Sequence, residues 1–326
     1  MAVHRAAELK AFAWENIEVG EELGWVEGIV SDFQIKTHAY AVDDYGDWYL
    51  KDSPFGGRIG HPMLLVNDMA RLFRLTYDVK PGVAVGLHTR NETELFRPVR
   101  LGQKVIIRGT HADKYQKRGR NYRVLAAEVR DEAGELLLRS RQTEIVGFES
   151  SAAVGIGQAS GTPGPDAITG EVPAGAPVVA RADGATPVGA VLPALAKHTT
   201  LEQSIAFSGF DYGWVEGGAR AMRFSIHTDP AEGLRPGQPG VIVQGLVSNA
   251  YLSELCTNFF GAPWLTSGRL SVAFVRPVIG GDDLTVAGLV KRREDEGGRG
   301  RLHLDVWCKN QRGELVTVGR ASALVE

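Results

Sequence analysis

Cysteine is scarce in this chain. Only Cys256 and Cys308 occur among its 326 residues, too few for a disulfide framework or a four-cysteine metal site. Both stand in apolar runs, so we expect them to be buried, reduced thiols. No group of histidines and cysteines has the spacing of metal ligands either, and the sequence therefore predicts no metal site.

Long hydrophobic runs are also missing. No apolar stretch approaches the roughly 20 residues that span a bilayer, and residues 1–14 lack the apolar segment of a secretory signal. A net charge of −3 gives no general attraction to nucleic acid or to acidic membranes. We therefore expect a soluble, cytoplasmic protein with no nucleic-acid partner and no membrane partner.

The chain does contain a second copy of itself. The run Arg97–Gly102, with Arg-Pro-Val at its start and glycine at its end, recurs at Arg276–Gly281, a step of 276 − 97 = 179 residues. The same step carries the Gly-Glu-Leu at Gly134–Leu136 to the one at Gly313–Leu315. A repeat of this length predicts two copies of one structural unit. Differences between the copies then indicate where function lies.

Composition divides the chain between the two copies. Glycine, alanine, proline and serine dominate from Gly147 to about Val188, and such a segment buries too little apolar surface to offset its ordering entropy. We therefore predict an N-terminal unit over residues 10–149, a linker over residues 150–187 and a C-terminal unit over residues 188–326.

The two copies predict the same opening elements. A run of strand-forming residues, at Trp25–Val30 and again at Val188–Leu195, leads to a short helix. Ser31–Asp32 and Thr199–Thr200 stand where helix N-caps are expected. A loop rich in glycine, aspartate and tyrosine follows in each copy.

An apolar helix is predicted next, at residues 62–77 in the first copy and 245–260 in the second. Both segments are apolar on most of their circumference, which is typical of a helix wrapped by other structure. Three runs with alternating polarity then predict strands joined by glycine turns. The sequence thus predicts an α+β fold in which each unit is an antiparallel sheet around a central helix.

Several of these motifs together resemble a known family. Ile226–Pro230, followed by Pro239–Leu246, resembles the catalytic-loop histidine and the start of the central helix in MaoC-like enoyl-thioester hydratases and dehydratases, in their double-hotdog form. Thr200–Gly209 resembles the lead-in to that loop, and the blocks at Arg97 and Arg276 resemble the strand after the helix. The resemblance covers nearly the whole chain outside the linker and implies a tandem hotdog fold.

The sequence departs from the family at one catalytic position. The family places an aspartate five residues before the histidine that matches His227, but Met222 stands there. Asp211 lies in an Asp-Tyr-Gly run that mirrors the one at Asp44, and we take it as the candidate for a displaced aspartate. Asp44 and His61, directly before the first apolar helix, form a second candidate pair. A purely structural role for either pair stays open.

Hydration of a 2-enoyl thioester needs a base, a proton source and donors for the negative charge on the thioester oxygen. The resemblance implies that His227 and Asp211 handle the protons. Gly245 opens its helix with a usable N–H group, whereas Pro62 in the first copy has none. Since losing one such donor costs roughly 2.7–4 kcal/mol, we expect the second unit to be catalytic and the first to shape the acyl pocket.

Four more residues are candidates for lining the pocket: Tyr45, Tyr212, Asp229 and Gln244. Aromatic packing is the alternative for the two tyrosines, and a turn is the alternative for Asp229, which precedes a proline.

The predicted function is a hydratase or dehydratase that acts reversibly on a 2-enoyl or 3-hydroxyacyl thioester. The expected partner is an acyl-CoA or acyl-carrier thioester, with CoA as the favoured carrier and a homodimer as the assembly under consideration. The resemblance implies no cofactor apart from this substrate. Two alternatives remain open at this point, a catalytically degenerate protein that binds acyl thioesters and a hotdog thioesterase.

Overall fold

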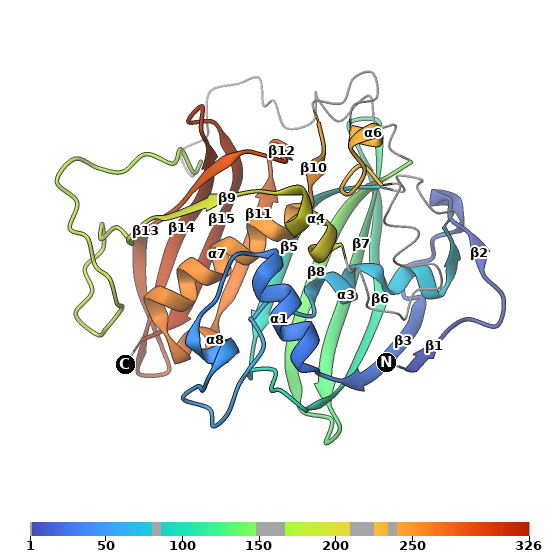
Figure 1. The fold of residues 1–326 in the computed structure, drawn as a ribbon, viewed down its shortest axis with the longest axis horizontal. Coiled ribbons are helices and arrows are strands. Elements are labelled where there is room, and N and C mark those ends of the chain that lie inside the picture. The colour runs from blue at the N-terminus through green and yellow to red at the C-terminus, as the bar shows by residue number, and fades with distance from the viewer. Residues whose placement is uncertain (1, 80–85, 148–166, 209–224, 234–239, 326) are drawn as a thin grey trace.

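One large antiparallel sheet dominates the fold (Figure 1). The computed structural model describes residues 2–79, 86–147, 167–208, 225–233 and 240–325, and within them eleven strands form this sheet. Their order across it is β1 (Ala2–His4), β3 (Glu22–Ile29), β6 (Lys104–Lys117), β7 (Arg120–Asp131), β8 (Leu136–Val146), β5 (Gly86–Leu95), β11 (Arg269–Phe274), β15 (Leu315–Leu324), β14 (Arg299–Asn310), β13 (Asp283–Glu296) and β9 (Leu195–His198). Two small sheets pair β2 (Lys10–Ala11) with β4 (Tyr77–Asp78) and β10 (Ile242–Val243) with β12 (Val278–Ile279).

The large sheet consists of two halves joined edge to edge. In the first half, which we call the first unit, the order is β3-β6-β7-β8-β5, and in the second unit it is the mirrored order β11-β15-β14-β13-β9. The join is the antiparallel pair of β5 and β11, from Arg269 opposite Glu94 to Ala273 opposite Arg90. Because backbone hydrogen bonds cross the join, the two units share one continuous sheet.

The strands of the two units repeat at the step seen in the sequence. β13 begins 283 − 104 = 179 residues after β6, and β14 begins 299 − 120 = 179 residues after β7. A bulge between His111 and Asp113 in β6 has its counterpart between Val290 and Arg292 in β13. Bulges bend a strand and re-aim its side chains, so the two halves of the sheet bend at equivalent places.

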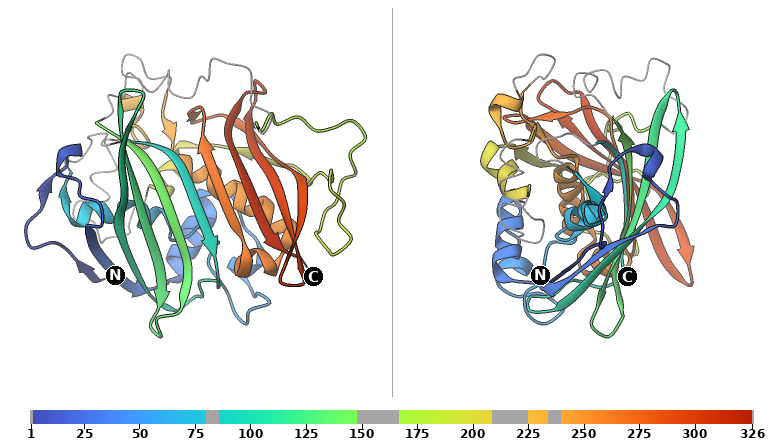
Figure 2. Two further views of the ribbon diagram at one scale, coloured as in Figure 1. Left: turned by 180° about the vertical axis from the view of Figure 1, so that it is seen from behind. Right: turned by 90° about the vertical axis from the view of Figure 1, so that its right-hand side faces the viewer.

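The helices lie on one face of this sheet (Figure 2). They are α1 (Asp32–Ala41), α2 (Asp47–Leu50), α3 (Val66–Arg71), α4 (Leu201–Phe207), α6 (Pro230–Gly233), α7 (Gly245–Phe260) and α8 (Ala262–Ser267), with 3₁₀ turns at Trp14–Asn16 and Leu72–Leu75. Among the helices of the described residues, none has the length and apolar character to cross a bilayer.

The central helix of the second unit matches its prediction. α7 spans Gly245–Phe260, and 13 of its 16 residues are buried, as expected for a helix that other structure wraps. Cys256 on α7 and Cys308 on β14 are buried free thiols, also as predicted.

The central helix of the first unit is shorter than predicted. The α-helix covers only Val66–Arg71 instead of residues 62–77, and the chain returns to a strand at Tyr77. The reason lies at its start, where the Leu64 N–H group bonds to the His61 carbonyl, so the chain makes tight turns before the helix begins. Pro62 within these turns has no N–H group to contribute.

The predicted first strand of the second unit, Val188–Leu195, is only partly correct. The regular strand β9 begins at Leu195. The preceding residues are irregular but follow the edge of β13, because the Gly189 N–H group bonds to the Val290 carbonyl and the Leu192 N–H group bonds to the Gly288 carbonyl.

Four strands of the large sheet, rather than the predicted three, follow the central helix in each unit of the described chain. The additional strands are β5 and β11, which join the units. Arg97 and Arg276 were expected on strands, but each lies in the loop directly after one of these two strands.

Both short helices predicted after the first strand carry a side-chain cap. Ser31 accepts a hydrogen bond from the Gln34 N–H group, and Thr200 accepts one from the Gln203 N–H group, each within a reciprocal capping box. Thr200→Ala should therefore lower the free energy of unfolding by about 1 kcal/mol, and Thr200→Ser should retain it. Urea denaturation measures this difference. An alanine variant as stable as the wild type would show that the cap contributes nothing.

Candidate active site

The N-terminus of α7 presents unused backbone donors. Gly245 is its first residue, after Gln244 as N-cap, and the Val247 N–H group bonds to the Gln244 carbonyl at 2.9 Å. Within the described residues, the N–H groups of Gly245 and Leu246 donate to no acceptor. These groups carry the positive end of the helix dipole. They can therefore stabilise a negatively charged oxygen.

Gly245 is required by the packing around it. A Cβ atom at this position would lie 2.9 Å from the ring of Phe274, the last residue of β11. Real Cβ atoms do not approach other atoms this closely, so a side chain here would push the start of α7 away from the sheet. Glycine is therefore the residue that allows this close packing.

His227 is tied to the strand that leads into α7. The Ile242 N–H group bonds to the Ile226 carbonyl at 2.9 Å, and Nδ1 of His227 lies 2.6 Å from the Ile242 carbonyl oxygen. Ile242 is only three residues before Gly245. The imidazole and the open helix end are consequently held by one short stretch of backbone.

This contact determines which ring nitrogen of His227 carries the proton. A carbonyl oxygen only accepts hydrogen bonds, so Nδ1 is the protonated nitrogen and Nε2 holds the lone pair. Burial lowers the pKa of His227 below the ordinary imidazole value, the bond to Ile242 opposes this shift, and the charge of Arg71 adds to it. The ring is thus neutral near pH 7, with Nε2 as a base.

In the first unit, the position equivalent to Gly245 is Pro62, which lies in the turns before α3. Pro62 has no N–H group, and the next amide, that of Met63, donates to Nδ1 of His61 at 3.0 Å. Because Nδ1 of His61 accepts a hydrogen bond, its proton is on Nε2, which lies 3.5 Å from the Asp44 carboxylate. His61 and His227 are therefore opposite tautomers.

The structure brings the second candidate pair, Asp44 and His61, together in the first unit. Both are almost fully buried. Asp44 also accepts a hydrogen bond from the Gly46 N–H group at 3.1 Å. Burial raises the pKa of Asp44, and burial lowers the pKa of His61 well below its usual range. With Nδ1 occupied and Nε2 protonated, His61 offers no lone pair to a substrate.

The sequence analysis did not predict two charged residues near the Asp44–His61 pair, Lys197 and Glu254. Lys197 Nζ lies 2.8 Å from the Glu254 carboxylate and donates to the Asp43 carbonyl, so it connects the two units. Their signal in the sequence is that Glu254 is the only charged residue of α7, and that Lys197 directly follows the apolar run Val191–Ala196. A buried charge of this kind needs a partner.

Three predicted residues do not enter the described site. Asp211 and Tyr212 lie outside the described residues. Tyr45 is 51% exposed beside Asp44, and no aromatic partner is recorded for its ring within the described chain.

Asp229 and Gln244 lie next to the candidate base and the candidate amide donors. The Asp229 carboxylate accepts a hydrogen bond from the Ala231 N–H group at 2.8 Å, which is the turn role considered as its alternative. Gln244 Nε2 donates to the Ser208 hydroxyl at 2.8 Å. Gln244 thereby joins the start of α7 to the end of α4.

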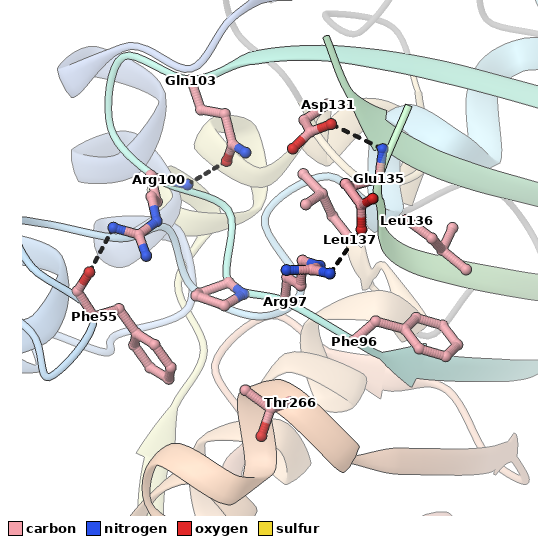
Figure 3. Close-up of a pocket in the computed structure, with 11 residues that line it drawn as sticks. Phe55, Phe96, Arg97, Arg100, Gln103, Asp131, Glu135, Leu136, Leu137 and Thr266 are labelled. Carbon is pink, nitrogen blue, oxygen red and sulfur yellow. Dashed lines mark hydrogen bonds and ion pairs between the residues drawn. The ribbon is translucent and has the colours of Figure 1, made fainter. Parts of the chain in front are cut away.

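A surface pocket of about 640 Å³ lies at the other end of α7 (Figure 3). Thr266, which lines it, belongs to α8, the helix after the C-terminus of α7, and α7 itself is about 24 Å long. The guanidinium groups in the pocket are engaged, since Arg97 pairs with Glu135 at 2.6 Å and Arg100 donates to the Phe55 carbonyl. Within the described residues no cluster of metal-ligating side chains was found.

Comparison with known proteins defines the fold. No protein-family profile matches the chain, and no curated protein matches its sequence. A solved structure titled MaoC-like dehydratase has a TM-score of 0.71 at 19% identity, over 96% of this chain and 100% of that one. A conserved hypothetical protein from Mycobacterium tuberculosis, described as a double hotdog, has a TM-score of 0.58 at 18% identity, over 95% and 97% of the two chains. The fold is a double hotdog.

A third similar structure is the peroxisomal multifunctional enzyme type 2 from Drosophila melanogaster, with a TM-score of 0.58 at 17% identity. The similarity covers 94% of this chain and 48% of that enzyme. The predicted tandem hotdog is thus confirmed. Within this double hotdog, His227 and Gly245 belong to the second hotdog, and Asp44 and His61 belong to the first.

The buried carboxyl group of Glu254 predicts a pH dependence of stability. Burial, with a smaller contribution from Asp44, raises the pKa of Glu254 from 4.5 to about 7, although Lys197 opposes the shift. The folded protein therefore keeps a proton that the unfolded chain releases. The stabilisation is full below about pH 4.5 and is lost as the pH rises through 7.

Urea denaturation at several pH values measures this effect. The free energy of unfolding should fall by at most roughly 3 kcal/mol between pH 4.5 and 8 because of this group, at about 1.4 kcal/mol per pKa unit. In Glu254→Gln the fall should be smaller. An identical pH profile in the variant would contradict the raised pKa.

Proposed function

We propose that this double hotdog catalyses the reversible addition of water to a 2-enoyl thioester, giving a 3-hydroxyacyl thioester, with CoA as the carrier. The observation that carries the proposal is the pairing of a neutral imidazole with an open helix N-terminus in the second hotdog. In the first hotdog the equivalent proline has no N–H group, and the histidine accepts a hydrogen bond from Met63 in the turn before α3. The fold shared with MaoC-like dehydratases supports the same reaction class.

The proposed chemistry assigns one task to each group. Nε2 of His227 takes a proton from water while the water oxygen forms a bond to C3. The electrons of the C2–C3 double bond shift toward the thioester carbonyl, and its oxygen accepts hydrogen bonds from the N–H groups of Gly245 and Leu246. Collapse of this enolate takes a proton at C2, for which Asp211 is the proposed donor. Dehydration follows the same steps in reverse.

One observation favours a second candidate function. Met222 replaces the aspartate of the family, and within the described residues the charged group that shifts the pKa of His227 is Arg71, not a carboxylate. A protein that binds acyl thioesters without hydrating them is the alternative, and a thioesterase on the same fold is another. We propose the cytoplasm as the compartment of this protein and a homodimer as its assembly.

A panel of 2-enoyl-CoA thioesters of increasing chain length distinguishes these functions. Hydration removes the ultraviolet absorbance of the conjugated thioester without releasing thiol, whereas hydrolysis releases free CoA, which a thiol reagent detects. Loss of absorbance without thiol supports the hydratase. Thiol release, or binding without either signal, would contradict it.

Matched asparagine variants test the two histidines. In His227→Asn the amide can still donate to the Ile242 carbonyl but offers no base, so kcat should fall by about 10²- to 10⁴-fold. In His61→Asn the amide oxygen can still accept from the Met63 N–H group, so kcat should stay within about threefold of the wild type. Steady-state kinetics on one enoyl-CoA provides the comparison. Equal losses in both variants would refute the assignment of the second hotdog as the catalytic one.

A further inference from the structure

A helix of the first hotdog binds the end of a helix in the second. Asn67 and Arg71 are four residues apart on α3 and so lie on one face of it. Asn67 Nδ2 donates to the Phe207 carbonyl at 2.7 Å, and the Arg71 guanidinium donates to the Ser208 carbonyl. Both carbonyls belong to the C-terminal end of α4, where helix acceptors lack internal partners and a cation is favourable.

Ser208 is the residue at which the segment leading to His227 leaves α4. It is fully buried, and its hydroxyl accepts the hydrogen bond from Gln244, the residue directly before Gly245. The far end of the same segment is held at Ile226 and His227 by Ile242. Arg71 therefore binds the end of α4 at Ser208, and the residues before α7 bind both Ser208, through the Gln244 side chain, and His227, through the Ile242 carbonyl.

We propose that Arg71 is a positioning residue for the reaction of the second hotdog. It places Ser208, and through the hydrogen bond from Gln244 to Ser208 it sets where the start of α7 lies. His227 follows this start, because its ring is bound to the Ile242 carbonyl three residues before Gly245. The inference rests on the proposed function. It gives the first hotdog a specific role in the catalysis of the second, beyond shaping a pocket.

The other unit supplies a matched control. Lys197 donates to the Val42 and Asp43 carbonyls at the end of α1, the helix that corresponds to α4. Its partner Glu254 occupies the position on α7 that Arg71 occupies on α3, because 254 − 71 and 245 − 62 are both 183. The same kind of cap thus holds the end of α1 in the first hotdog. The histidine of that hotdog, His61, offers no lone pair to a substrate.

Steady-state kinetics on one enoyl-CoA tests the inference. Arg71→Met should lower kcat by about 10- to 100-fold with KM within about threefold, since a displacement near 1 Å suffices for such losses. Arg71→Lys restores a cation. Its kcat should therefore exceed that of Arg71→Met by at least about a third of the factor that Arg71→Met loses. If Arg71→Met does not fold, a kcat loss of about threefold or more in folded Arg71→Lys carries the test, because lysine lacks the guanidinium geometry. Full activity in Arg71→Met, or in Arg71→Lys when only that variant folds, would overturn the inference.

The control is the double variant Lys197→Met/Glu254→Gln, which removes the other cap and its buried partner together. It should keep kcat within about threefold of the wild type, and an equal loss there would show a merely structural effect and overturn the inference. A wild type inactive on every thioester refutes the proposed function instead. The imidazole ¹⁵N signals of His227 then decide, since a shift in Arg71→Met supports the positioning role and unchanged signals refute it.

Discussion

The hydrogen bond from His227 Nδ1 to the Ile242 carbonyl is the constraint on which the account of the site depends. At 2.6 Å it fixes the ring orientation and keeps the proton on Nδ1. The lone pair of Nε2 then lies on the side of the ring away from the backbone. Because Ile242 leads within three residues to Gly245, this bond also relates the base to the open amides of α7. Without it, a histidine in a loop has no defined catalytic geometry.

The two hotdogs show how one backbone plan can give different chemistry. Strand bounds and bulges repeat at a constant step, but the helix starts differ. In the first hotdog a proline and an accepting histidine stand in the turns before α3, and in the second a glycine packed against Phe274 begins α7 itself. The first hotdog retains a buried Asp44–His61 pair, and Lys197 of the Lys197–Glu254 ion pair in the second hotdog reaches it by donating to the Asp43 carbonyl. The free-energy cost of burying these groups is offset here by pairing within each unit.

The sequence predicted what depends on periodicity and repetition. The alternation of the strands, the apolar circumference of 245–260 and the caps at Ser31 and Thr200 are local patterns, and they predicted an antiparallel sheet around a central helix. The double hotdog was implied by the resemblance of the motifs to a known family. The predicted start of the first central helix was wrong, because the bond between Met63 and His61 depends on a turn that no sequence pattern indicates. Lys197 and Glu254 were missed, since a pairing between residues 57 positions apart has no local signature.

The most direct test of the central claim is the protonation of the two imidazoles, measured by ¹⁵N–¹H correlation NMR on uniformly labelled protein near pH 7. The account predicts opposite tautomers. His227 should show a protonated Nδ1 and a lone-pair-bearing Nε2, and His61 should show a protonated Nε2 and a lone-pair-bearing Nδ1. The same tautomer in both rings, or a positively charged His227, would contradict the assignment of His227 as the base.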